Sequence, residues 1–223
     1  EVVSGYTGFF LGIKSIVPDA HMDVQYTNSW FNIQDEGKAA EALMARGCVI
    51  IGQHADSTGA PKAVQTAKDN GANVYSVGYN VDMLQAAPTA ALTSSTNDWS
   101  VYYTYLFKTM LDGKVPATDW SEGYETGAVA ITALGPEVAP GTAEKVAEVE
   151  AALKDGSLHV FDTSKFTVGG KKLDSYKADV DTDEKFEKDT EVVKDGYFHE
   201  SEFRSAPYFD LRIDGINLLN EKF

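Results

Sequence analysis

Residues 48–59 read CVIIGQHADSTG, an apolar run that passes directly into a polar turn ending in glycine. The apolar part is typical of a buried strand, and Cys48 at its start fits a buried, inert side chain. Residues 34–46 have the pattern of a helix that Gly47 ends, and a second helix is predicted over residues 60–69. A buried strand between two helices is the repeating unit of a parallel α/β sheet.

The same alternation of helix and strand extends outward over the first hundred or so residues. Strands of a parallel sheet end at one common edge, and open α/β sheets bind their ligands at that edge. The loops that follow the strands are therefore the places where we expect a functional site. The predicted helices cover residues 3–15, 34–46, 60–69 and 100–112, and the predicted strands cover residues 22–27, 48–53, 73–78 and 90–94.

The pattern changes after Gly113. Strand-like sequence over residues 125–134 precedes a predicted helix over 142–154, and strand-like sequence returns over 208–219. Residues 174–195 are rich in Asp, Glu and Lys, and a solvated hairpin or excursion is predicted there. We therefore expect a ligand-binding α/β lobe over residues 1–113, followed by crossover segments, a helix and C-terminal strands over residues 114–223.

The charge balance bears on the choice of partners. The 223 residues carry 19 Lys and Arg against 34 Asp and Glu, a formal net charge of −15. Such a chain repels phosphate backbones and anionic bilayer surfaces, so nucleic acid is not an expected partner. The single cysteine excludes a disulfide within the chain.

Two tryptophans stand in loops after predicted strands. Trp30 can stack on a flat heterocycle, a contact worth about 1–3 kcal/mol per base in nucleic-acid recognition. The alternative is that Trp30 packs between helix and sheet while Asn32 caps the next helix. Trp99 closes the polar loop that contains Asn97, and it either walls a pocket or is the first core residue of the following helix. We take Trp30, Asn97 and Trp99 as candidate ligand contacts.

Polar side chains in two other loops complete the candidate site. His54 and Asp56 can present a donor and an acceptor to a ring edge, although Asp56 or Ser57 would also serve as a helix N-cap. Asn80 suits recognition of a base edge, and Asp82 can accept from a sugar hydroxyl or a ring N–H. Either residue would instead fit an Asx turn.

Catalysis is not indicated by these residues. The spacing of His54 and Asp56 alone is weak, and no Ser or Cys elbow, metal-ligand spacing or phosphate loop accompanies it. We therefore predict a protein that is not an enzyme, with no catalytic residue, metal ligand or cofactor. A rival interpretation is a purine nucleoside hydrolase or transferase that uses Asp56 or Asp82 as a base.

At these loops the sequence resembles the basic membrane protein (BMP) family, the substrate-binding lipoproteins of bacterial ABC importers that include purine nucleoside receptors. The resemblance runs in the family's order over residues 1–135. Its matching stretches are GFFLGIKS at 8–15, WF at 30–31 with residues 36–46 after it, IGQHADS at 51–57, LTS at 92–94, NDWSVYY at 97–103 and LDG at 111–113.

The resemblance implies a type I periplasmic-binding fold, an α/β architecture in which helices cover both faces of a parallel sheet. The chain opens on a helix with no strand before it, so one lobe is expected to be near complete and the other partial. The implied function is capture of a purine base or nucleoside by hinge closure and delivery to ABC permease subunits. A ligand-sensing domain of a regulator with this fold is a further alternative.

The resemblance also implies a monomer in an extracytoplasmic place, either periplasmic or lipid-anchored through a cysteine that this chain does not contain. Nucleoside receptors of the family typically have a glycine-rich turn at the position of Asp56, an aspartate at that of Asn80 and a lysine near Asn97. These departures favour a base, or a nucleoside that is held differently.

Overall fold

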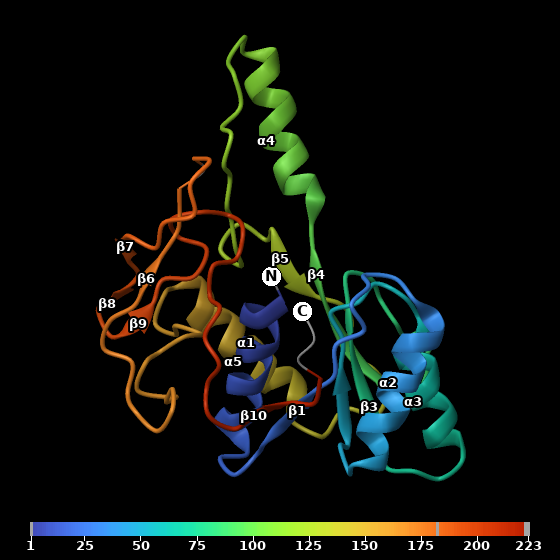
Figure 1. The fold of residues 1–223 in the computed structure, drawn as a ribbon. Helices are drawn as coiled ribbons and strands as arrows, with labels where there is room; N and C mark the ends of the chain where they lie inside the picture. The colour runs from blue at the N-terminus through green and yellow to red at the C-terminus, as the bar shows by residue number, and fades with distance from the viewer. Residues whose placement is uncertain (1, 182, 221–223) are drawn as a thin grey trace. The chain divides into compact units, whose positions relative to one another are not determined.

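A computed structural model describes residues 2–181 and 183–220, and Figure 1 shows the order of the elements. All the predicted helices are confirmed, with ends within two residues of the expected ones. The helices are α1 (Val2–Ile16), α2 (Ile33–Ala45), α3 (Gly59–Asp69), α4 (Trp99–Leu111) and α5 (Thr142–Lys154).

Helix α2 begins and ends where local chemistry requires it. The side chain of Asn32 accepts a hydrogen bond from the Asp35 amide at 3.1 Å, and the Asn32 amide donates to Glu36 Oε1 at 3.0 Å. These reciprocal bonds satisfy amides that have no partner within the first turn. The helix ends before Gly47, whose φ of 93° lies in the left-handed region that favours glycine. The part of the alternative interpretation in which Asn32 caps this helix is therefore confirmed.

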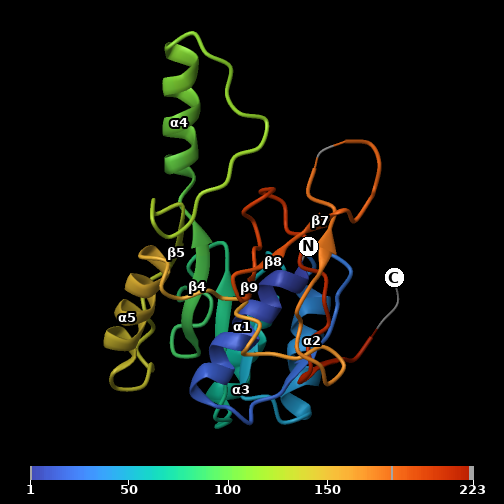
Figure 2. The same ribbon diagram turned by 90° about the vertical axis from the view of Figure 1, so that its left-hand side faces the viewer.

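A four-stranded sheet carries the loops of interest. Its order is β2–β3–β4–β5, in which the first three strands are parallel and β5 is antiparallel to β4. In Figures 1 and 2, α2 and α3 lie on one side of this sheet and α5 lies on the other. The strands are β2 (Ile50–Gly52), β3 (Tyr75–Tyr79), β4 (Ala91–Asn97) and β5 (Val129–Ile131).

The first predicted strand pairs differently from the expectation of one parallel array. Strand β1 covers only Met22–Val24 and pairs with β10 (Ile216–Leu218) in a separate two-stranded sheet. The Asn220 side chain extends this pairing, because it accepts from the Tyr26 amide and donates to the Tyr26 carbonyl, each at 2.8 Å. The backbone after β1 is thus satisfied by residues almost two hundred positions away, which no local pattern reveals.

The expected C-terminal strand over residues 208–219 is also shorter in the structure. Only Ile216–Leu218 forms a strand, whereas Tyr208 and Phe209, which are neighbours in sequence, are both buried. A strand sends neighbouring side chains to opposite faces, so two successive core residues break the period of two. These aromatic residues belong to a core cluster instead.

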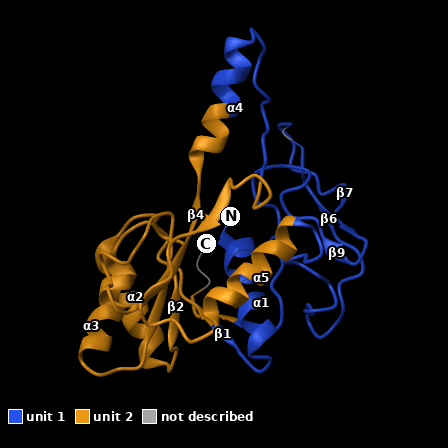
Figure 3. Cartoon of the chain, turned by 180° about the vertical axis from the view of Figure 1, so that it is seen from behind, with its two compact units in different colours: residues 1–22, 105–122, 155–216 blue, residues 23–104, 123–154, 217–223 orange. Residues whose placement is uncertain are grey.

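The chain divides into two compact units (Figure 3). Unit 1 comprises residues 1–22, 105–122 and 155–216, and unit 2 comprises residues 23–104, 123–154 and 217–223. Neither coincides with residues 1–113, and the predicted division into lobes stays a prediction. Each unit has its own apolar core.

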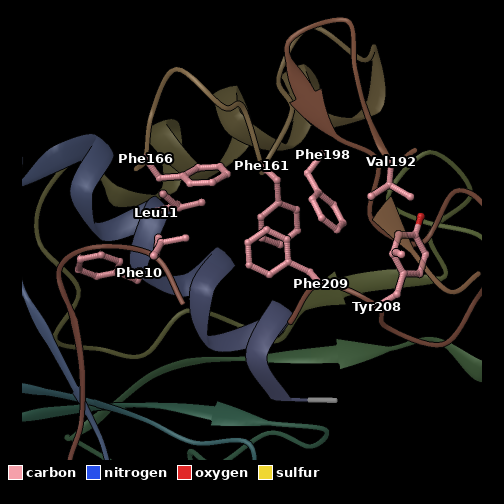
Figure 4. Close-up of a cluster of buried hydrophobic side chains, with 10 residues drawn as sticks. Phe10, Leu11, Phe161, Phe166, Val192, Phe198, Tyr208 and Phe209 are labelled. Atoms are coloured by element: carbon pink, nitrogen blue, oxygen red, sulfur yellow. The ribbon is translucent and has the colours of Figure 1, made fainter. Parts of the chain in front are cut away.

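The core of unit 1 is largely aromatic (Figure 4). Phe198 is 1% exposed, and its ring centroid lies 4.7 Å from that of Phe209. Helix α1 contributes Phe10, which is fully buried, and Leu11. The cluster therefore joins the first helix to the chain after residue 160. Its members are Phe10, Leu11, Phe161, Phe166, Ala178, Val192, Phe198, Tyr208, Phe209 and Ile213.

The core of unit 2 is built from smaller side chains. It lies between the four-stranded sheet and the helices α2 and α3, and Val64 of α3 is fully buried within it. Small side chains allow the helices to approach the sheet and one another closely. The members are Ala40, Ile51, Ala60, Val64, Val74, Met83, Ala87, Ala90 and Ala91.

Described residues near both ends of the acidic stretch 174–195 pair as in a hairpin, which is one of the two arrangements predicted there. Strands β6 (Lys177–Ala178) and β7 (Thr190–Glu191) pair antiparallel at its base. Lys188 Nζ lies 2.6 Å from Asp210 Oδ2 and donates to the Tyr176 hydroxyl at 2.7 Å, and that hydroxyl donates to Asp210. Burial raises the pKa of Asp210, but the hydrogen bonds from Lys188 and Tyr176 outweigh it and hold that pKa below its ordinary value.

Exchange of Asp210 for asparagine is expected to lower the free energy of unfolding by less than about 1 kcal/mol at pH 7, because both charged groups are partly exposed. The folded-state pKa is depressed, so the carboxylate's contribution is present above the unfolded pKa and lost as the pH falls through the folded one. In urea unfolding the deficit of the variant should shrink below about pH 4. A deficit that grows in acid would contradict the assignment, and Asp174→Asn, in a looser 3.8 Å pair, is the control.

Candidate functional site

The strand ends of unit 2 bring the predicted loops together. Because β2, β3 and β4 are parallel, their carboxyl ends lie at one edge of the sheet. The loops at this edge are residues 53–58 after β2, residues 80–83 after β3 and residues 96–99 around the end of β4. Residues 28–32 after β1 join them through a hydrogen bond to Asp56. We call these four loops the carboxyl edge.

Hydrogen bonds connect three of the predicted residues in series. The Asp56 amide donates to the Trp30 carbonyl at 2.6 Å, and the Asn80 side-chain nitrogen donates to Asp56 Oδ1 at 2.6 Å. Asn80 has a φ of 64°, its amide donates to the Ser95 carbonyl at 2.9 Å, and its carbonyl accepts from the Thr96 hydroxyl at 2.7 Å. Residues from four separate loops are therefore fixed relative to one another.

The turn after β2 is fixed by a side chain within it. Gln53 donates from Nε2 to the carbonyls of Ala55 and Ser57, at 2.7 and 3.0 Å. The His54 ring is half-buried, and its centroid lies 4.9 Å from that of the Tyr79 ring, at an angle of 53°. His54 therefore packs on an aromatic residue at the end of the neighbouring strand.

The alternative that made Asp56 the cap of α3 is wrong. The N-cap residue is Thr58, which makes no side-chain capping bond, and the Gly59 amide donates instead to the Ser57 hydroxyl at 3.1 Å. The carboxylate of Asp56 turns to Asn80. Ser57 therefore supplies the side-chain hydrogen bond at the start of α3, and the Asp56 carboxylate does not bond to this helix.

Both predicted stacking residues are exposed. The Trp30 residue is 50% exposed and Trp99 is 61% exposed, so neither packs into the core. Trp99 is the first residue of α4, a helix that has no buried residue. The core interpretations given above for the two indoles are therefore wrong, and both rings have surface available for a ligand.

The remaining predicted residues serve the local backbone or lie on the strand. Asp82 Oδ1 accepts from the Leu84 amide at 2.8 Å, which is the predicted Asx turn. Asn97 is exposed on β4 and pairs with Val129 of β5. Neither Asp82 nor Asn97 makes a hydrogen bond to the other predicted residues in the described part of the chain.

The carboxyl edge is acidic. Its loops contain Asp56, Asp82 and Asp98 and no Lys or Arg. Hydrogen bonds from Ser100 lower the pKa of Asp98, which caps α4, so this carboxylate is charged at neutral pH. Three carboxylates outweigh the roughly half positive charge at each of the N-termini of α2, α3 and α4. The edge therefore disfavours anionic ligands.

Residues that position the candidate contacts were missed by the sequence analysis. Gln53 fixes the 53–58 turn, and the hydroxyl of Thr96 fixes the backbone of Asn80. The signal for Gln53 is a long amide side chain directly before a polar turn. No local signal marks Thr96, because its partner is sixteen residues away.

Other features of the described residues add no second site. A surface hollow of about 290 Å³ lies along α2 and the segment after β1, and its lining residues are Gln25, Tyr26, Thr27, Asp35, Lys38, Ala39 and Ala42. Among residues 2–181 and 183–220, no group of three or more His, Cys, Asp or Glu side chains is placed to bind a metal ion. None of the helices in the same part of the chain has the length and hydropathy of a membrane span.

The fold is that of ABC transporter solute-binding proteins. A solved structure of such a protein from Conexibacter woesei matches 71% of this chain and 52% of its own, with a TM-score of 0.56 and 19% sequence identity. At that identity the likeness concerns the fold alone. It confirms the predicted α/β architecture of the periplasmic-binding kind.

The chain belongs to the Bmp family, the PnrA-like substrate-binding proteins of ABC transporters, whose family model matches residues 1–159. It is 36% identical over 182 residues to a purine-binding protein of Brucella abortus, covering 78% of this chain and 50% of that protein. It is 33% identical over 166 residues to a putative ABC transporter glucose-binding protein of Haloferax volcanii, covering 74% and 41%. The chain thus spans about half the length of these relatives, or somewhat less.

Proposed function

We propose that this chain serves in a solute-binding protein that captures a purine base or nucleoside and delivers it to an ABC permease. The observation that carries the proposal is the carboxyl edge, where two exposed indoles accompany a fixed Asp56–Asn80 pair. Flat rings stack on indoles, and base edges pair with carboxylate and amide groups. Both recognition elements of a purine are therefore available at one sheet edge.

Family membership supports binding rather than chemistry. The matched family is one of substrate-binding proteins, and a relative covering 78% of this chain is named as purine-binding. The acidic edge favours a neutral base or nucleoside over a nucleotide. We further propose that the protein closes on its ligand by a hinge motion. It acts as a monomer outside the cytoplasm, either lipid-anchored or periplasmic.

Replacing Trp30 with alanine is expected to weaken purine binding at least tenfold, because loss of one stacked ring costs about 1–3 kcal/mol and about 1.4 kcal/mol is already tenfold. Isothermal titration with guanosine and hypoxanthine measures the effect. Trp30→Phe keeps a flat ring and should retain most of the affinity. Trp120→Ala removes the third tryptophan, which stacks on Tyr105 within unit 1, and is the size-matched control. Equal affinity of wild type and Trp30→Ala would remove Trp30 from the site.

The absence of chemistry is part of the proposal and has its own test. Inosine incubated with the protein should be recovered intact, since binding alone breaks no glycosidic bond. Chromatography that detects free hypoxanthine in proportion to protein concentration would favour the hydrolase interpretation. The same assay with Asp56→Asn and Asp82→Asn would then identify the base.

A further inference from the structure

We propose that Asp56 and Asn80 form a fixed acceptor pair that selects ligands carrying two adjacent hydrogen-bond donors. This inference rests on the proposed function and specifies how the carboxyl edge chooses among its ligands. The pair is joined by the 2.6 Å hydrogen bond from Asn80 Nδ2 to Asp56 Oδ1.

The bond to a carboxylate fixes the orientation of the Asn80 amide. A carboxylate oxygen only accepts, so the amide nitrogen must face Asp56 and the amide oxygen must point elsewhere. Among the described residues, Asn80 Oδ1 and Asp56 Oδ2 accept no hydrogen bond. Two acceptor oxygens on adjacent side chains thus remain for a ligand, and one of them belongs to a carboxylate that has no cationic partner in that part of the chain.

The backbone of each member is held by a different neighbour. The Asp56 amide is bound to the Trp30 carbonyl, and both backbone polar groups of Asn80 are bound to residues of β4. Asn80 also occupies the left-handed region, at a φ of 64°, which asparagine populates more often than most residues other than glycine. A pair fixed in this way loses little conformational freedom when a ligand binds.

The ligand must supply donors where the protein supplies acceptors. Two arrangements in a purine nucleoside do so: the ring N–H and neighbouring amino group of a guanine-type base, and the vicinal hydroxyls of ribose. A ligand that lacks both leaves Asp56 Oδ2 and Asn80 Oδ1 without a donor once water is excluded, which costs about tenfold or more in affinity. Both arrangements share the same chemistry, and a titration series separates them.

The experiment measures three ligands against wild type, Asp56→Asn and Asn80→Gly by isothermal titration. Inosine lacks the amino group of guanosine, and 2′,3′-dideoxyguanosine lacks the diol. We expect one of these two ligands to bind wild type at least tenfold more weakly than guanosine. Asp56→Asn should reduce that ratio to threefold or less, because the asparagine side chain has a donor nitrogen in place of one of the two acceptor oxygens of aspartate. The ligand that shows the effect identifies the donors that Asp56 accepts from.

Asn80→Gly tests the positioning role of the amide. Glycine tolerates the left-handed backbone, so this variant removes the side chain without straining the loop. For Asn80→Gly, the ratio of the affinity for guanosine to that for the weaker ligand should lie between the ratios of wild type and Asp56→Asn. Asp69→Asn, an exposed carboxylate at the far end of α3, makes the same charge change and should leave all affinities as in wild type.

The outcomes separate this inference from the proposed function. If all three ligands bind and every ratio is the same in wild type and Asp56→Asn, the acceptor pair does not select donors and the inference is wrong while purine binding stands. If none of the three binds to wild type, the proposed function is wrong, and the inference is overturned with it. Circular dichroism and thermal unfolding of each variant exclude misfolding as the cause of a loss.

Discussion

Replacing Phe198 with alanine is expected to lower the free energy of unfolding by about 3–5 kcal/mol. Phe198 is 1% exposed, and its ring contacts those of Phe161, Tyr176, Tyr208 and Phe209. Removal of a ring enclosed by other rings leaves a cavity that these neighbours fill only in part. Guanidinium unfolding followed by circular dichroism measures the loss.

A phenylalanine from the same unit provides the control. Phe186 is 77% exposed on the acidic hairpin, so Phe186→Ala removes the same atoms without opening a cavity, and its effect should stay within about 0.5 kcal/mol. Similar losses for the two variants would show that the aromatic cluster does not stabilise unit 1. The result also concerns residues beyond 159, where the family match ends, because this cluster packs α1 against them.

A methyl group at Gly59 is expected to destabilise the chain by about 3 kcal/mol and to weaken purine binding more than tenfold. A Cβ atom there would lie 2.2 Å from the Ile33 carbonyl oxygen, far inside contact distance. That oxygen belongs to backbone, so no side-chain rotation relieves the clash, and overpacking costs of about 1–3 kcal/mol apply at their upper end. Gly59 and Ile33 are the first residues of α3 and α2, so separating them displaces loops of the carboxyl edge.

The same substitution at Gly12 is the matched control. Gly12 lies within α1, and a Cβ atom there would have no neighbour within 4 Å. Alanine is the better helix former, so Gly12→Ala should be neutral or stabilise by up to about 1 kcal/mol. The unfolding temperature should therefore fall for Gly59→Ala and rise or stay unchanged for Gly12→Ala, and the affinity for guanosine should fall only for Gly59→Ala. A Gly59→Ala variant that matches Gly12→Ala would mean that α2 and α3 tolerate a wider separation.

The structure bears unevenly on the predicted site. Trp30, His54, Asp56 and Asn80 come together in hydrogen-bonded or packed loops, whereas among the described residues Asp82 closes its own turn and Asn97 makes no hydrogen bond to these four. Strand order predicts which loops lie near one another, but it does not show whether a side chain bonds within its own loop or to the next one. The roles of these residues as ligand contacts stay predictions.

Local sequence patterns predict the helices, the polar turn after residue 52 and the loops at which a ligand is expected. Helix periodicity, the Asn32 cap and Gly47 after the helix each act over a few residues, so a short stretch of sequence is enough to recognise them. The family resemblance over the first 135 residues rests on the same local stretches, and the family match confirms it.

The contacts between residues far apart in the sequence are apparent only in the folded chain. The pairing of β1 with β10, the burial of Phe10 among residues 161–213 and the bond between Asp56 and Asn80 join positions 24 to about 200 residues apart. Each such contact depends on how whole elements pack to bury apolar surface and satisfy backbone groups, and many partners are compatible with any one local pattern. Asp56 shows the difference plainly: its local sequence fits a helix cap, but the adjacent strand places Asn80 within 2.6 Å, and the carboxylate bonds there instead.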